Sequence, residues 1–150
     1  MDLSDLYSDK ILDLAGNAIA PGRLADADAS ARKVSRVCGS VIEVDVKVRD
    51  RVIVGYGHDI SACALGQTSA AVVAREIVGT PVADFRGLTG QMHAMLKENG
   101  PPPAGKWSDL AYLEPVRAFR ARHMSTLLVF DAVVEALEKI ESAESVTARA

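Results

Sequence analysis

The sequence predicts an α+β fold in which a small three-stranded antiparallel sheet packs against several helices. The clearest strand signal is residues 41–48, where hydrophobic and charged side chains alternate along the chain. Helix-like spacing of hydrophobic residues precedes this segment once and follows it several times. A helix, a few strands and then a series of helices, without an internal repeat, is typical of this class.

The length and composition indicate one domain. The chain has 150 residues, 49% of them hydrophobic, which is enough for a single core. We expect this domain to cover residues 1–140 and a flexible C-terminal tail to cover residues 141–150.

Charge and hydropathy exclude two classes of partner. The formal net charge is -3, and acidic and basic residues are mixed, so we expect no nucleic-acid partner. The first twenty residues lack the basic start and apolar run of a signal peptide, and no segment reaches the roughly 18 apolar residues of a membrane span. We therefore expect a cytoplasmic protein with no membrane partner.

The N-terminal half is expected to form one helix and the sheet. Hydrophobic residues at helical spacing predict a helix over residues 5–17, and Pro21-Gly22 predicts a loop after it. Strands are expected at residues 33–37, 41–48 and 52–56. Within the second strand, Ile42, Val44, Val46 and Val48 share one face, and Glu43, Asp45 and Lys47 share the other, exposed one.

The C-terminal half is expected to be helical. One helix begins at Ala62 with Ser61 as its N-cap, a second follows Thr80-Pro81, and the last covers residues 124–140. Residues 99–105 are rich in proline and glycine and predict an exposed connector.

Two cysteines are the first candidates for chemistry. Cys38 lies between two strand segments, where Gly39 allows a tight turn near the surface. Cys63 lies near the start of a helix, where free amides favour the thiolate, the form that binds metal and attacks sulfur. The alternative is that both are small buried hydrophobic residues. Their separation fits no local zinc motif, so any metal site must be assembled by the fold.

Two histidine positions are weaker candidates. His123 directly precedes the last helix, and taken alone it is more typical of a helix start than of a ligand. His58-Asp59 precedes the Cys63 helix, and such a pair at a strand end is usually only solvated.

Together these segments resemble the iron-sulfur cluster assembly scaffold family of the NifU N-terminal domain, IscU and SufU, over about residues 6–137. Residues 6–13 are similar to the family's opening helix, and Cys38-Gly39 and residues 63–71 resemble its first two ligand regions. Residues 123–127 resemble the third, and the long stretch before them is more like the SufU branch.

The resemblance implies a scaffold rather than an enzyme. Such a protein accepts sulfur from a cysteine desulfurase, binds iron, holds an iron-sulfur cluster, expected to be [2Fe-2S], and passes it to apo acceptor proteins. Residues 113–117 resemble a chaperone-recognition segment, which makes a chaperone system a further implied partner, but they lie several residues further from His123 than that segment should. The alternative is simply a helix broken by proline.

The departures from the family change the ligand set. Met124 stands where the family has its third cysteine, and Ser40 stands where it has an aspartate. The resemblance then implies Cys38, Cys63 and His123 as the metal and cluster ligands, because imidazole suits iron and zinc alike. Two alternatives remain: a zinc-dependent sulfur acceptor of the SufU kind, and a degenerate paralogue that only docks the desulfurase.

Overall fold

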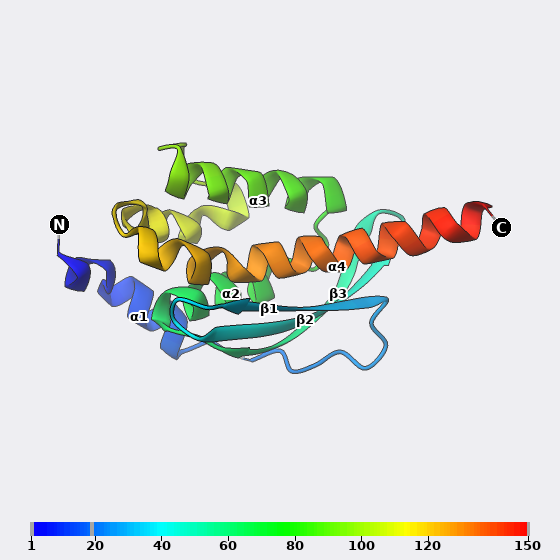
Figure 1. Ribbon diagram of the computed structural model, residues 1–150, viewed down its shortest axis with the longest axis horizontal. Helices are drawn as coiled ribbons and strands as arrows, with labels where there is room; N and C mark the ends of the chain where they lie inside the picture. The colour runs from blue at the N-terminus through cyan, green and yellow to red at the C-terminus, as the bar shows by residue number, and fades with distance from the viewer. Residues whose placement is uncertain (1, 19, 150) are drawn as a thin grey trace.

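The computed structural model of the protein describes residues 2–18 and 20–149, with side chains described through residue 144. A three-stranded antiparallel sheet in the order β1-β2-β3 packs against the helices, and the long α4 crosses one of its faces (Figure 1). This confirms the predicted α+β class. The elements are η1 (Leu3–Leu6), α1 (Asp9–Gly16), β1 (Ala29–Ser35), β2 (Ser40–Arg49), β3 (Val52–Ser61), α2 (Ala64–Glu76), α3 (Val82–Lys97), η2 (Gly105–Ala118), η3 (Arg120–Arg122) and α4 (His123–Arg149).

The alternating pattern of β2 places its hydrophobic residues in the core. Ile42, Val44 and Val46 are fully buried on the face that α4 covers, and they belong to one continuous hydrophobic core. Hydrophobic burial on this scale is the main stabilising contribution to such a domain. Burial of the alternating hydrophobic residues, the same pattern that predicted the strand, therefore holds β2 in the centre of the sheet.

The sheet extends further than the sequence suggests, and this moves the start of α2. Ser61 pairs with Val41 as the last residue of β3, so it is not an N-cap. The helix begins at Ala64 instead, with Cys63 as its N-cap. His58 lies within β3 at 7% exposure, and its Nδ1 lies 2.7 Å from the Tyr56 hydroxyl, so the expectation of a solvated His58 is wrong.

The last helix is longer than predicted. α4 continues past residue 140 to Arg149, so residues 141–149 extend the helix (Figure 1). Flexibility of this end stays a prediction. No helix among the described residues is both long and apolar enough to cross a membrane.

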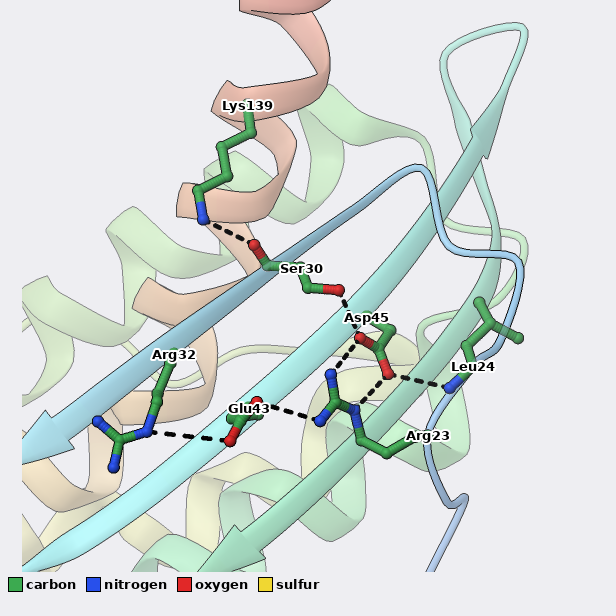
Figure 2. A network of polar contacts seen from close by, with 7 residues as sticks. All are labelled: Arg23, Leu24, Ser30, Arg32, Glu43, Asp45 and Lys139. Atoms are coloured by element: carbon green, nitrogen blue, oxygen red, sulfur yellow. Dashed lines mark hydrogen bonds and ion pairs between the residues drawn. The ribbon is translucent and has the colours of Figure 1, made fainter.

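A segment that the sequence left as a loop crosses the other face of the sheet. We call residues 20–28 the strap. Arg23 in the strap donates two hydrogen bonds to the Asp45 carboxylate, from Nε at 2.7 Å and from Nη2 at 2.8 Å (Figure 2). The Leu24 amide and the Ser30 hydroxyl donate to the same carboxylate at 2.9 and 2.5 Å. Asp45 is consequently only 2% exposed, so the prediction that it faces solvent is wrong.

Gly57 should be required for the strap to lie so close to β3. A Cβ at this position would lie 2.5 Å from the Gly22 carbonyl oxygen and 2.7 Å from the Leu24 nitrogen, and both are backbone atoms. Gly57→Ala should therefore lower the free energy of unfolding by about 1–3 kcal/mol, the usual cost of overpacking. Thermal unfolding measures this. The control is Gly90→Ala in α3, where no atom lies within 4 Å and no loss of stability is expected.

Candidate functional site

Cys38 lies in the turn that joins β1 to β2. Gly39 adopts a φ of 72°, which a residue with a side chain rarely adopts, and its amide donates to the Ser35 carbonyl at 2.8 Å. Ser35 and Ser40 are the last register pair of the two strands, and both are buried beneath the turn. The expected turn is thus present and leaves the Cys38 side chain half-buried.

Hydroxyl groups surround the Cys38 thiol. Its Sγ lies 3.3 Å from the Ser35 Oγ and 3.0 Å from the Ser40 Oγ. Burial raises the pKa of the thiol, but interactions with the Ser35 and Ser40 hydroxyls, the Ser40 amide and the Ser125 hydroxyl outweigh it and lower the pKa to about 7. A large fraction of Cys38 is therefore thiolate at neutral pH.

Cys63 approaches the same place from the start of α2. As N-cap it accepts a hydrogen bond from the Gln67 amide through its carbonyl oxygen at 2.9 Å, and its thiol is left for other contacts. Its Sγ lies 3.6 Å from the Ser125 Oγ. Gly66 permits this approach of α2 to α4, because a Cβ there would lie 3.1 Å from the Ser125 carbonyl oxygen.

Ser125 joins the two thiols and is the site residue that the sequence did not indicate. It lies in the first turn of α4 at 1% exposure, and its hydroxyl donates to the Arg122 carbonyl at 3.3 Å. The same oxygen lies 3.6 Å from the Cys63 Sγ and contributes to the lowered pKa of Cys38. In the sequence, the feature that could have indicated Ser125 as a site residue is its position directly after His123-Met124. The structure thus brings Cys38 and Cys63 together around one hydroxyl.

His123 is not part of this group. It is 8% exposed, and its Nε2 lies 3.1 and 3.2 Å from the carbonyl oxygens of Val116 and Arg117. Both neighbours are acceptors, so Nε2 carries the proton and Nδ1 keeps a free lone pair, the arrangement of many metal-ligating histidines. Nevertheless, no three His, Cys, Asp or Glu side chains within the described residues are grouped closely enough to hold a metal ion.

The two positions that depart from the family differ in exposure. Met124 is 50% exposed, whereas Ser40 is 2% exposed and its hydroxyl lies against the Cys38 thiol. Two thiols and an imidazole nitrogen are donors that suit iron and zinc alike. The donor chemistry therefore fits either metal, although the three donors are not assembled.

Alkylation of Cys38 should have a half-maximal rate near pH 7, because the thiolate is the reactive form and the pKa of Cys38 is about 7. The measurement is the rate of iodoacetamide labelling against pH in a Cys63→Ser variant. Ser40→Ala removes the closest hydroxyl and should move the midpoint upward. A midpoint near the ordinary value of about 8.5 in the parent would contradict the prediction.

Comparison with known proteins agrees with this architecture. The curated iron-sulfur cluster assembly scaffold protein IscU of Thermotoga maritima is 28% identical over 136 residues, which cover 90% of this chain and 94% of that protein. A crystal structure of a nitrogen-fixing NifU-like protein (N-terminal) from Brucella abortus is 46% identical, covers 93% of this chain and 97% of its own, and superposes with a TM-score of 0.90.

A more distant structure shares the fold. The putative iron-sulfur cluster assembly scaffold protein for the SUF system from Fervidobacterium islandicum AW-1 is 18% identical and superposes with a TM-score of 0.82 over 91% of this chain and 99% of that one. The family profile described as NifU-like N terminal domain matches residues 6–125. The chain therefore belongs to the NifU-like N-terminal domain family, which includes scaffold proteins of iron-sulfur cluster assembly.

Proposed function

We propose that the protein is a scaffold or carrier for iron-sulfur cluster assembly and not an enzyme. It accepts sulfur from a cysteine desulfurase, binds iron, holds a [2Fe-2S] cluster transiently and transfers it to apo acceptor proteins. The observation that carries the proposal is the convergence of Cys38 and Cys63, from a hairpin turn and a helix start, on the Ser125 hydroxyl. A chaperone system is a further proposed partner.

Cys38 is the proposed sulfur acceptor. Its lowered pKa supplies a thiolate that attacks the terminal sulfur of a persulfide on the desulfurase. The new S–S bond forms on Cys38, the bond within the partner's persulfide breaks, and the partner's thiolate leaves. No net oxidation is needed, because the oxidised sulfur moves from one thiolate to another.

His123 is the proposed third ligand. The two carbonyl oxygens that accept from Nε2 fix the orientation of the ring and leave the lone pair on Nδ1 for a metal. Because the three donors are not assembled, groups at the site must rearrange for the imidazole to join the thiols. A cluster held by two thiolates and one imidazole leaves one iron position for another ligand.

One observation favours a second function. No group of three metal donors exists within the described residues, and Met124 is a weak ligand, so a protein that only docks a desulfurase fits the donor arrangement as well. A zinc-dependent sulfur acceptor is the other alternative, but the same lack of a third donor weakens zinc coordination too. Metal content and partner binding distinguish these functions.

The test is reconstitution with iron and sulfide without oxygen, followed by metal and acid-labile sulfide analysis and a visible spectrum. Iron with sulfide that is lost in Cys38→Ala and in Cys63→Ala supports the proposal. Stoichiometric zinc in the protein as purified supports the zinc-dependent acceptor instead. Desulfurase binding without any metal supports the docking protein and contradicts cluster assembly.

A further inference from the structure

A cavity of about 600 Å³ lies next to the thiol pair. Its walls come from the end of α3, the η2–η3 segment, the first turns of α4 and the tip of the Cys38 turn. This volume is within the range of small-molecule sites in proteins. The lining residues that matter below are Val37, Lys97, Arg117, Arg120, Met124 and Asp131.

The cavity is positively charged although the chain as a whole is negative. Lys97 and Arg120 are exposed, and neither forms an ion pair or side-chain hydrogen bond with the part of the chain that the structure describes. Arg117 donates to the Gly100 carbonyl at 3.0 Å. The lining carboxylate, Asp131, is held by His93 at 2.7 Å. Cations without partners in a concave site are typical of sites for anionic ligands.

Two residues of the cavity lining are direct sequence neighbours of the thiol site. Val37 directly precedes Cys38, and Met124 directly precedes Ser125, whose Oγ lies 3.6 Å from the Cys63 Sγ. Val37 is 66% and Met124 50% exposed, so the part of the cavity lining that adjoins the thiol-bearing segments consists of uncovered apolar side chains. The unbranched Met124 side chain can also change rotamer at little cost.

We propose that this cavity binds a small thiol that carries carboxylate groups, such as glutathione. Lys97 and Arg120 hold the carboxylates, and the sulfur end points past Val37 and Met124 to Cys38 and Cys63. There the thiol loses its proton to water and supplies the thiolate that Met124 cannot. The role of that thiolate as a cluster ligand rests on the function proposed above; binding and orientation of the ligand do not.

The first test is calorimetric titration of the metal-free protein with glutathione. We expect saturable binding that weakens by roughly tenfold or more in a Lys97→Gln, Arg120→Gln double variant, because two charge-assisted contacts are removed. Both residues are exposed, so the fold should be retained. The matched control is Arg32→Gln, an exposed arginine on β1, which should bind as the parent does. Absence of saturable binding, or equal affinity in the double variant and the parent, overturns the proposal.

The second test reports the orientation of the sulfur end. In the metal-free protein, the Cys38 thiolate attacks glutathione disulfide, a mixed disulfide forms on Cys38 and glutathione thiolate leaves. We expect this rate, followed by intact-mass spectrometry, to fall in the Lys97→Gln, Arg120→Gln variant and to stay unchanged in Arg32→Gln. An equal rate in all three proteins overturns the proposed orientation. Neither test contains iron, so failure of cluster assembly is recorded separately by the reconstitution experiment.

Discussion

Replacing Met124 with cysteine should lengthen the lifetime of the reconstituted cluster on the order of ten- to a hundredfold, the range in which changes at a metal site alter affinity. Thiolate is a far stronger ligand for iron than the neutral thioether of methionine. Met124 is half-exposed and directly precedes Ser125, which contacts Cys63, so the new thiol enters beside the thiol pair without disturbing the core. The same change should slow transfer of the cluster to an apo acceptor.

The measurement is the decay of the visible absorption of the cluster in the presence of a chelator, for the parent and for Met124→Cys. Met124→Leu is the control, because it keeps an apolar side chain of similar size and adds no ligand. Its decay should match that of the parent. Equal decay in Met124→Cys and Met124→Leu would show that position 124 does not reach the cluster.

Local patterns in the sequence predicted much of the framework. The alternation along β2 depends on side chains two residues apart, and the turn at Cys38 depends on the neighbouring Gly39, so both could be predicted from adjacent residues. The family match over residues 6–125 confirms the family resemblance. The ligand regions that the resemblance implied stay a prediction.

Contacts between distant segments could not be predicted in this way. Ser125 meets Cys63 because Gly66 lets α2 approach α4, and nothing near Ser125 in the sequence indicates that approach. The alternating pattern places Asp45 on the polar face of β2, as predicted, yet Arg23 and the strap cover that face and bury it. In both cases a tertiary contact decides what a local pattern leaves open.

Asp45→Asn should lower the free energy of unfolding by about 2–4 kcal/mol near neutral pH, a larger loss than that expected for Gly57→Ala. The substitution keeps the shape of the side chain but removes the charge that accepts two hydrogen bonds from Arg23 and one each from Leu24 and Ser30 (Figure 2). The Asp45 carboxylate is buried although Arg23 is 47% exposed, and replacing one of its oxygens with an amide group leaves buried donors without an acceptor, which is costly. Denaturation by urea measures the loss.

The stability loss caused by Asp45→Asn should become smaller as the pH falls. Hydrogen bonds from Arg23 hold the pKa of the Asp45 carboxyl well below its ordinary value, against the opposing effect of burial. A carboxyl with a lowered folded-state pKa stabilises the protein above its unfolded-state pKa of about 3.9, and this stabilisation is lost as the pH falls toward the folded-state value. The difference in free energy of unfolding between the parent and Asp45→Asn should therefore be largest above roughly pH 5 and should shrink in acid.

The control is Asp26→Asn, which changes an exposed carboxylate of the strap that pairs with Lys47. It should change the free energy of unfolding little at neutral or acid pH. A difference between the parent and Asp45→Asn that stays constant from neutral to acid pH would mean that the charge of Asp45 is not what holds the strap to the sheet.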